Sequence, residues 1–309
     1  MIKILVNDGM EEGALNKLIA NGYDVLDRHF GEEELKQRIR EFDIMIVRSA
    51  TKIRKPLIDA AKNGKLKLII RGGVGVDNID VDYAAENGIM VKNTPDASTI
   101  SVAELTLAHL LAISRYVNIS NVTMRKGKWE KKKYKGVELY GKTLGLVGFG
   151  RIAKEVAKRA YAMGMDVIYY DKLGMAKGYN NYKFFELEEL LRKADYISIH
   201  IPFDKSQSAV IGRKEIEMMK DGVYIVNCAR GGVIDEKALV DGLNTGKVSA
   251  VGMDVFENEP EPCRELVNNQ RVSVTPHIGG STFEAQKRIG EEIVTIIEKY
   301  CLNRNLVNA

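Results

Sequence analysis

A histidine, a glutamate and an arginine follow three separate apolar stretches in the second half of the chain. His277 follows residues 272–274, Glu259 follows residues 250–255, and Arg230 ends the stretch 223–230. An imidazole can exchange a proton with a hydroxyl group near neutral pH, and a carboxylate can orient that imidazole and stabilise its charged form. A guanidinium binds a carboxylate through two parallel hydrogen bonds. These residue types predict proton transfer on a substrate with a hydroxyl and a carboxylate.

Each of these assignments has an alternative. Glu257 competes with Glu259 as the partner of the histidine, and Glu259 could equally be a solvated loop acid. Arg230 could form a surface ion pair instead of binding a substrate. His29 lies in a charged loop and His109 in an apolar helical pattern, so both are interpreted as structural or exposed residues.

A glycine-rich motif in the middle of the chain has the pattern of a dinucleotide-binding loop. The apolar residues 144–147 run directly into Gly-Phe-Gly-Arg-Ile-Ala, residues 148–153, and a helical pattern follows. Gly148 permits a tight turn, Gly150 lets the backbone approach a pyrophosphate, and the small Ala153 lets the helix pack on the strand. The helix N-terminus then presents unpaired N–H groups to the phosphates.

The next apolar stretch ends at Asp171, about 20 residues after the glycine loop. A carboxylate there accepts hydrogen bonds from both hydroxyls of an adenosine ribose and repels a 2′-phosphate, which favours NAD over NADP. The neighbouring Lys172 weakens that exclusion. Asp254 could accept a hydrogen bond from a nicotinamide carboxamide, or could pack against a neighbouring loop. Asp235 is expected to cap the helix that begins at Glu236.

A second glycine-rich segment, residues 72–75, also follows an apolar stretch. Asn78 stands where the third small residue is required, and the next strand ends at Asn93 without an acid, so a dinucleotide would lack its ribose anchor. We interpret this segment as a loop whose amides approach a smaller anion, with a plain structural turn as the alternative.

The hydrophobic pattern predicts which elements hold these residues. Short β-rich stretches alternate with helical patterns such as residues 32–40, and a long, mostly buried helix is predicted over residues 101–117. The predicted strands are residues 2–6, 23–26, 44–47, 66–70, 89–91, 143–147, 167–170, 196–201, 223–226, 250–255 and 272–274. Apolar strands joined by helices form parallel sheets covered on both faces, with ligands bound at the carboxyl ends of the strands.

The fold class is therefore predicted to be α/β, with two doubly wound parallel sheets in two domains. A final helix over residues 282–300 is long enough to return to the first domain, which we expect to be discontinuous. The predicted bounds are residues 1–97 with 284–309 for one domain and residues 98–283 for the other.

Composition excludes several other classes. The 309 residues are 45% hydrophobic and 28% charged, which describes an ordered globular protein, and the net charge of +4 is too small to favour nucleic-acid binding. Cys228, Cys263 and Cys301 are too widely spaced for a disulfide framework or a metal site. No apolar run of 18 residues and no leader pattern is found, so we expect a cytoplasmic protein without a membrane segment.

Four motifs in this order resemble those of the D-isomer-specific 2-hydroxyacid dehydrogenases, and the resemblance covers nearly the whole chain. They are residues 148–150, 227–232, 254–260 and 276–280. The resemblance implies a Rossmann NAD domain inserted in a flavodoxin-like substrate domain, with Arg230, Glu259 and His277 as catalytic residues. The cofactor-binding residues that it implies are Gly148, Gly150, Arg151, Ile152, Asp171, His200, Pro202, Cys228, Ala229, Asp254, Gly279 and Gly280.

Residues 47–52, 75–80, 93–95 and 127–130 are most similar to the branch of that family that oxidises D-3-phosphoglycerate. That similarity implies a step toward serine. The substrate-binding residues that it implies are Arg48, Ser49, Gly73, Val74 and Lys131, the last from the partner subunit. A plain surface charge is the alternative for Arg48.

Three residues depart from the pattern of that branch. Ala153 replaces a glycine, which its small size should allow, Val74 replaces a cofactor-contacting threonine, and Lys131 replaces an arginine. A lysine keeps the charge but loses the fork, which weakens selectivity for phosphate. The chain ends at Ala309 without room for a C-terminal regulatory domain, so serine feedback through such a domain is not expected.

The same residues are compatible with other functions. Within the same chemistry they are reduction of glyoxylate or hydroxypyruvate, or of pyruvate to D-lactate. Outside it, the alternative is a non-enzymatic corepressor that senses NADH. The lysine-rich residues 126–135 are interpreted as a face that steers an anionic substrate. We expect a homodimer through the cofactor domains, with Trp129 as an anchor.

Overall fold

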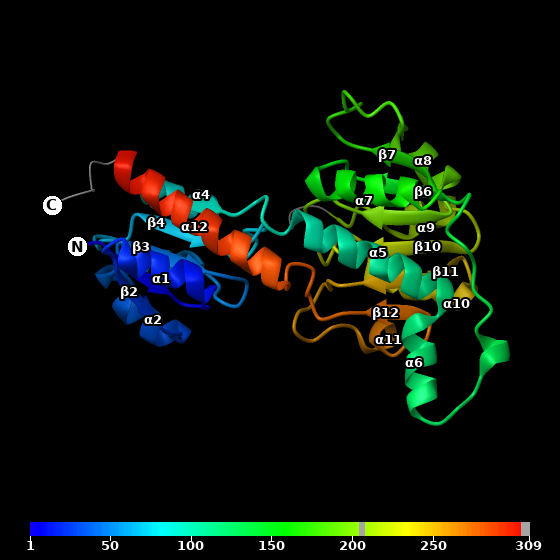
Figure 1. Cartoon of the computed structure of the whole chain (residues 1–309), viewed down its shortest axis with the longest axis horizontal. Helices are drawn as coiled ribbons and strands as arrows, with labels where there is room; N and C mark the ends of the chain where they lie inside the picture. Colours follow the sequence, from blue (N-terminus) through cyan, green and yellow to red (C-terminus); the bar gives the residue numbers. More distant parts are fainter. Residues whose placement is uncertain (204–207, 304–309) are drawn as a thin grey trace. The chain divides into compact units, whose positions relative to one another are not determined.

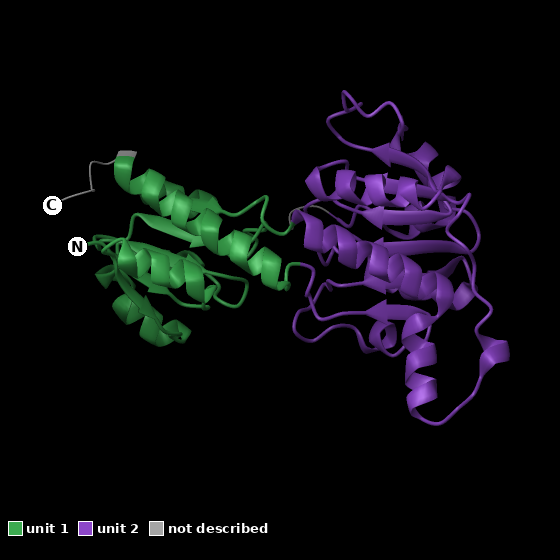
Figure 2. Ribbon diagram, viewed as in Figure 1, with its two compact units in different colours: residues 1–98, 280–309 green, residues 99–279 purple. Residues whose placement is uncertain are grey.

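The computed structural model describes residues 1–203 and 208–303, which form two compact units. Unit 1 comprises Met1–Ser98 and Gly280–Ala309, and unit 2 comprises Thr99–Gly279 (Figure 2). The domain bounds expected from the sequence differ from these units by a few residues at each junction, and residues 304–309 of the expected first domain lie outside the described residues.

Unit 1 is built on a five-stranded parallel sheet in the order β2-β1-β3-β4-β5, the flavodoxin-like order (Figure 1). Helices cover both faces, so every residue of β3 is buried. The strands are β1 (Lys3–Val6), β2 (Asp24–Asp27), β3 (Ile44–Val47), β4 (Leu68–Arg71) and β5 (Met90–Asn93). The helices are α1 (Glu12–Ala20), α2 (Glu32–Arg38), α3 (Lys55–Ala61), α4 (Val81–Glu86) and α12 (Phe283–Asn303).

The last helix belongs to unit 1 because its apolar face completes that unit's core. Ile293 and Ile297 of α12 pack in one buried cluster with Ile4, Ile44 and Leu68 of the sheet. The chain thus returns to its first domain, as expected from the length of the helix predicted over residues 282–300.

Unit 2 is built on a seven-stranded parallel sheet in the order β12-β11-β10-β9-β6-β7-β8. If β6 is taken as the first strand, the strands from β8 to β11 have the order of a Rossmann sheet. Strand β12 adds one further strand beside β11. The strands are β6 (Thr143–Val147), β7 (Asp166–Tyr170), β8 (Lys183–Phe184), β9 (Tyr196–Ile199), β10 (Val223–Asn227), β11 (Val248–Met253) and β12 (Val272–Val274). The helices are α5 (Thr99–Arg115), α6 (Val117–Arg125), α7 (Arg151–Ala162), α8 (Leu187–Lys193), α9 (Arg213–Met218), α10 (Glu236–Thr245) and α11 (Arg264–Val267).

Helices cover both faces of this sheet as well. The buried cluster on one face includes Val102 of α5 and Val156 of α7, and the cluster on the other includes Leu190 of α8 and Leu239 of α10. The α/β class and the two parallel sheets predicted from the sequence are thus confirmed.

Most predicted strands differ from the observed ones by one or two residues at an end, and three further details differ from the sequence-based expectation. The long buried helix ends at Arg115, because Tyr116 adopts a left-handed conformation (φ 56°) before α6 begins. The helical pattern of residues 32–40 continues beyond Arg38 as a 3-10 turn, Ile39–Glu41. Strand β8 was not predicted, since two residues paired with β7 are too few to show a periodic pattern.

Within the described residues, each helix taken alone is too short or too polar to cross a membrane. Only α5 and α6 together pass that test of length and composition, and they are bent by 66° at the break between them.

Candidate active site

Apart from Lys131, the residues of unit 2 that the sequence predicts for the site follow adjacent strands at one edge of the seven-stranded sheet. Each of them lies at or just beyond the carboxyl end of a strand, where open parallel sheets bind their ligands. Gly148, Gly150, Arg151 and Ile152 follow β6, Asp171 follows β7, His200 and Pro202 follow β9, Cys228, Ala229 and Arg230 follow β10, Asp254 and Glu259 follow β11, and His277 and Gly279 follow β12.

The glycine loop after β6 is shaped as the motif predicts. Gly148 has φ 90°, and a Cβ atom there would lie 2.7 Å from the carbonyl oxygen of His200, so only glycine fits. Gly150 precedes α7 without a side-chain cap, and a Cβ atom on it would meet no atom within 4 Å. Phe149 is buried against Tyr169, with ring centroids 3.9 Å apart. An open, uncapped helix N-terminus of this kind suits a phosphate group.

Asp171 is held beside that loop. Its Oδ2 accepts a hydrogen bond from the amide of Phe149 at 2.8 Å, and its Oδ1 accepts one from the amide of Leu173 at 2.9 Å. A carboxylate oxygen can accept more than one hydrogen bond, so both oxygens can still bind ribose hydroxyls. The glycine loop, the start of α7 and Asp171 therefore fit a dinucleotide whose ribose carries no 2′-phosphate.

His277 and Glu259 come together although 18 residues separate them. The Nδ1 atom of His277 lies 2.7 Å from Oε2 of Glu259, and the other carboxylate oxygen accepts a hydrogen bond from the amide of Phe256 at 3.0 Å. Burial acts to raise the pKa of Glu259, but the hydrogen bonds from His277 and Phe256 and the attraction of His277 and Arg230 outweigh it and lower that pKa. The ionised carboxylate accepts from Nδ1–H, which leaves Nε2 to meet a substrate.

The alternative partner, Glu257, is used elsewhere. Its Oε1 accepts a hydrogen bond from the amide of Glu236 at 3.1 Å, and its own amide donates to Oε1 of Glu236 at 2.8 Å. Of the two glutamates left open by the sequence, the structure thus pairs Glu259 with the histidine. Asp235 caps α10 as predicted, accepting a hydrogen bond from the amide of Ala238.

The loop that carries Arg230 lies directly against the loop that carries Glu259. A Cβ atom on Gly231 would lie 1.8 Å from the carbonyl oxygen of Phe256, so glycine permits this approach. Asn227 shapes the turn by donating to the carbonyl of Arg230 at 2.9 Å, and the guanidinium of Arg230 donates to the carbonyl of Ala229 at 2.6 Å. A positive group therefore stands beside the His277–Glu259 pair.

Asp254 holds the loop that carries His277 through hydrogen bonds. It is 1% exposed, and its carboxylate accepts hydrogen bonds from the hydroxyl of Thr275 at 2.6 Å and from the amides of Ile278 and Gly279 at 2.8 Å each. These contacts agree with one of the two expectations for Asp254, which is that it packs against a neighbouring loop. Its contact with a nicotinamide stays a prediction.

The remaining histidines have structural partners. His109 is buried, and its ring nitrogens lie 3.1 Å from the hydroxyl of Ser273 and 3.0 Å from that of Thr275. Desolvation lowers the pKa of His200 to about 3, so its ring is neutral where it meets the hydroxyl of Ser198 at 2.9 Å. His29 is exposed and contacts the carbonyl of Asn7.

In unit 1, the expected substrate-binding residues also follow neighbouring strands. Arg48 and Ser49 follow β3, and Gly73 and Val74 follow β4, which pairs with β3. Asp8, which was not predicted from the sequence, follows β1 and is nearly buried at 4% side-chain exposure. Its carboxylate accepts hydrogen bonds from the amide of Arg48 at 2.7 Å and from the hydroxyl of Thr51 at 2.6 Å. Its position as an acid directly after a predicted strand could have identified Asp8 from the sequence.

Two further residues that the sequence predicts for the site are Lys131 and Gly280. Lys131 begins the short 3-10 turn Lys131–Lys133 between α6 and β6, so its predicted role as a phosphate ligand for a partner subunit stays a prediction. Gly280 lies at the start of the C-terminal segment of unit 1, where its carbonyl accepts a hydrogen bond from Gln286.

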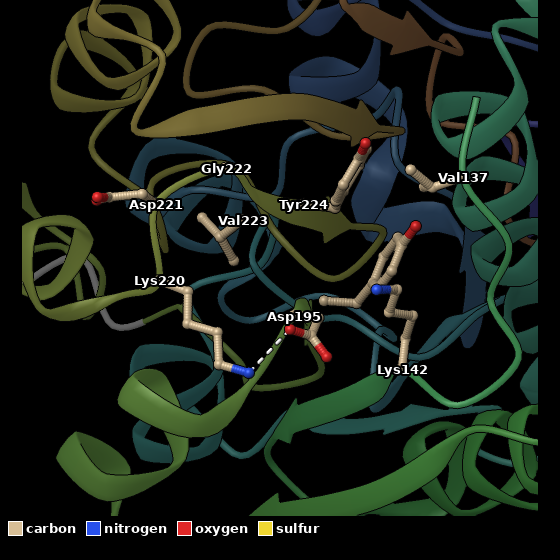
Figure 3. Close-up of a pocket in the computed structure, with 9 residues that line it drawn as sticks. Val137, Lys142, Asp195, Lys220, Asp221, Gly222, Val223 and Tyr224 are labelled. Carbon is tan, nitrogen blue, oxygen red and sulfur yellow. Dashed lines mark hydrogen bonds and ion pairs between the residues drawn. The ribbon is translucent and has the colours of Figure 1, made fainter. Parts of the chain in front are cut away.

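A pocket of about 190 Å³ lies at the opposite edge of the unit 2 sheet, near the amino ends of β9 and β10 (Figure 3). Its lining includes Lys220 and Asp195, whose side chains form an ion pair at 2.8 Å. This pocket lies apart from the strand ends that carry the candidate site. No group of three or more His, Cys, Asp or Glu side chains suited to a metal ion occurs among residues 1–203 and 208–303.

A Rossmann-ordered sheet, a glycine loop at an uncapped helix and an acid after the next strand define a dinucleotide-binding α/β protein with an acid–base pair. Residues 107–279 match the sequence model of the D-isomer specific 2-hydroxyacid dehydrogenase, NAD binding domain. The chain belongs to the D-isomer specific 2-hydroxyacid dehydrogenase family, and this part of it is the NAD-binding domain.

Known proteins of this family resemble the chain over nearly all of its length. It is 45% identical to a D-3-phosphoglycerate dehydrogenase of Methanocaldococcus jannaschii over 100% of this chain and 60% of that protein. It is 48% identical to a hydroxypyruvate reductase of Thermotoga maritima over 96% of this chain and 97% of that protein. Its structure resembles a glyoxylate reductase of Paecilomyes thermophila with a TM-score of 0.88 and 33% identity, over 96% and 94% of the two chains.

Proposed function

We propose that this chain oxidises the 2-hydroxyl group of D-3-phosphoglycerate to give 3-phosphohydroxypyruvate, with NAD as the cofactor, a step toward serine. The observation that carries the reaction class is the His277–Glu259 pair, 2.7 Å apart, with Arg230 on the adjoining loop. The chain spans about 60% of the length of the phosphoglycerate dehydrogenase that it matches, so this substrate is part of the proposal.

In the proposed reaction, each of the three residues has one task. Arg230 binds the substrate carboxylate through its guanidinium and brings the 2-hydroxyl toward the histidine. Nε2 of His277 accepts the hydroxyl proton, and Glu259 stabilises the imidazolium through Nδ1–H. In the direction of reduction the same imidazolium returns the proton to the carbonyl oxygen.

The cofactor would be held by the glycine loop, the first turn of α7 and Asp171. Bound NAD supplies the redox chemistry by accepting the hydride from C2, so that the hydroxyacid becomes a ketoacid. The protein's own contribution is orientation: the amides before α7 bind the phosphates, and Asp171 binds the ribose hydroxyls.

The choice of a phosphorylated substrate is supported by the loop after β3. Asp8 binds the amide of Arg48, and Asn78 donates to its carbonyl at 2.8 Å, so the backbone of this cation is held on both sides. A guanidinium that extends from a backbone held in this way suits the phosphate of a three-carbon acid. Similarity to a D-3-phosphoglycerate dehydrogenase over the whole chain supports the same choice.

Hydroxypyruvate or glyoxylate reduction is the second candidate. It is favoured by the 48% identity to a hydroxypyruvate reductase, of whose length the chain covers 97%. The same three catalytic residues would act in that reaction, with His277 donating the proton. Only the need for a phosphate group separates the two candidates.

Following NADH absorbance with a panel of substrates decides between them. The panel contains 3-phosphoglycerate, glycerate and D-lactate with NAD, and hydroxypyruvate, glyoxylate and pyruvate with NADH. A kcat/KM at least about 10-fold higher for 3-phosphoglycerate than for glycerate supports the proposal, and equal values support the second candidate. Tight NADH binding without turnover of any pair would instead indicate a corepressor that senses NADH.

We also propose that the chain acts as a homodimer formed by unit 2. Apolar side chains are exposed along α5, α6 and the segment that follows them. They are Leu111, Val117, Val122, Met124 and Trp129, which are 41%, 55%, 44%, 52% and 79% exposed. A second copy would remove this apolar surface from water.

A further inference from the structure

A buried histidine that is not part of the acid–base pair is linked by a chain of hydrogen bonds to the loop that carries His277. His109 lies in the middle of α5, which packs against β11 and β12 (Figure 1), and it is 2% exposed. Gly252 of β11 makes room for it, because a Cβ atom on that glycine would lie 2.6 Å from the Cβ of His109. The ring is thus built into the interface between helix and sheet.

The direction of each hydrogen bond follows from the acceptor at its end. The carboxylate of Asp254 accepts the hydroxyl hydrogen of Thr275 at 2.6 Å. A hydroxyl has only one hydrogen, so Thr275 must accept where it meets Nε2 of His109 at 3.0 Å. Nε2 therefore carries the ring hydrogen.

The other ring nitrogen is then an acceptor. Desolvation lowers the pKa of His109, although the attraction to Asp254 acts to raise it. The lowered pKa favours the neutral ring. In a neutral ring with its hydrogen on Nε2, Nδ1 accepts the hydroxyl hydrogen of Ser273 at 3.1 Å. Every ring atom that can form a hydrogen bond has a defined partner, so the ring holds Thr275 in one rotamer.

The far end of this chain is the histidine loop. Asp254 binds the amides of Ile278 and Gly279, the residues directly after His277, at 2.8 Å each. His277 itself has φ 53°, a left-handed conformation that is unfavourable in a residue other than glycine and persists only where its surroundings hold it. The hydrogen bonds to Asp254 are such a constraint.

We propose that His109 is a positioning residue for the acid–base histidine: it fixes the Thr275 hydroxyl, which orients Asp254, which holds the loop of His277. An apolar residue of similar size at position 109 would fill the same space. It would leave Thr275 without its donor, and the hydroxyl could then turn away from Asp254. The effect on turnover rests on the proposed function, whereas the effect on the loop does not.

The experiment uses two replacements that preserve volume, His109→Leu and Thr275→Val, and their double variant in the full chain. The first readout is hydrogen exchange at the amides of Ile278 and Gly279, without substrate. The second is kcat on the pair that the wild-type protein turns over, with the NADH Kd measured alongside. Thr275→Ser and His109→Gln keep a hydroxyl and an N–H donor.

Each single variant is expected to exchange these two amides about 10-fold faster and to lower kcat about 10-fold, with a nearly unchanged NADH Kd. The double variant should lose no more than the worse single variant, because both break the same chain. Thr275→Ser and His109→Gln should recover most of kcat. Ser114→Ala, which removes another buried hydroxyl of α5 that contacts Tyr196, should change neither readout.

The proposal is overturned if exchange or kcat in folded His109→Leu and Thr275→Val stays within about two-fold of the wild type, or if their losses multiply in the double variant. If His109→Leu does not fold, Thr275→Val alone decides by the same limits. Wild-type protein without activity on any 2-hydroxyacid would refute the proposed function only, and amide exchange would still test the link.

Discussion

At the scale of single residues, the proposed chemistry depends on the short contact between His277 and Glu259. Replacing His277 with asparagine removes the proton acceptor and should lower kcat by about 10²–10⁴-fold. The NADH Kd should change little, because the residue acts on the substrate hydroxyl. Titrating NADH fluorescence beside steady-state kinetics measures both quantities. Turnover close to the wild-type value would exclude His277 as the acid–base residue.

The two neighbouring glutamates offer a matched comparison. Glu259→Gln replaces the charge that stabilises the imidazolium, so we expect kcat to fall about 10- to 100-fold. Glu257→Gln changes an acid two residues away that binds Glu236 instead, and kcat should fall far less. Steady-state kinetics of both variants provide the test, and equal losses would contradict the assignment of Glu259.

In the proposed function, Arg48 is the residue expected to separate the two candidate substrates. A charge-assisted hydrogen bond contributes about 1.5–3 kcal/mol, so Arg48→Ala should lower kcat/KM for 3-phosphoglycerate by about 10- to 100-fold. Turnover of glyoxylate should change by less than about two-fold, since glyoxylate has no phosphate. Lys52→Ala, an exposed cation of the same loop, is the matched control. Parallel losses on both substrates would rule out a phosphate contact.

At the scale of elements, the first turn of α10 is joined to the loop of Glu259 through Glu236. Glu236 is 6% exposed. Burial and the repulsion of Glu257 and Glu259 raise its pKa, although a hydrogen bond from the Glu257 amide acts to lower it. The folded protein therefore binds the Glu236 proton more tightly than the unfolded chain does. The ordinary pKa of a glutamate is 4.5, and below that pH the contribution of Glu236 to stability is fully present. This contribution is lost as the pH rises through the pKa that Glu236 has in the folded protein.

Glu236→Gln keeps an oxygen acceptor for the Glu257 amide and removes the buried charge. We expect its free energy of unfolding to exceed that of the wild type at pH 7 and to equal it near pH 4. Urea unfolding at the two pH values measures the difference. A variant that is less stable than the wild type at pH 7 would show that the charge is favourable where it stands.

Most elements were predictable because their signals are local. Strands such as β3 and β12 have the predicted bounds, since an apolar run flanked by polar residues is read from neighbouring positions. The break at Tyr116 has no such signal. A left-handed tyrosine interrupts an apolar pattern that continues on both sides, so only the packed structure reveals where α5 ends.

At the scale of the whole molecule, the proposed dimer gives the apolar side chains of α5 and α6 a partner. The wild-type protein should elute at about twice 34.5 kDa, and Trp129→Ala should shift the elution toward the monomer mass at low concentration. Light scattering measures the mass directly. Phe283→Ala, which changes an exposed aromatic residue of unit 1, should leave it unchanged. A monomeric wild-type protein would refute the dimer.

The two parallel sheets, the glycine loop and the strand ends that carry Arg230, Asp171 and His277 follow from the amino-acid sequence alone. Periodicity, turn residues and motif spacing are short-range properties, and the carboxyl ends of parallel strands necessarily meet at one edge. The sequence therefore predicted that Arg230, Asp171 and His277 follow strands at the same edge of one sheet, whereas it did not single out Asp8.

Which of those residues contact one another was decided only in three dimensions. The sequence favoured Glu259 with Glu257 as the competing assignment, but the contact of Glu259 with His277 depends on how the chain turns after β11. His109 and Thr275 are 166 residues apart and meet because α5 packs where β11 has a glycine. Hydrogen bonds act over about 3 Å, so strand order and helix placement select their partners.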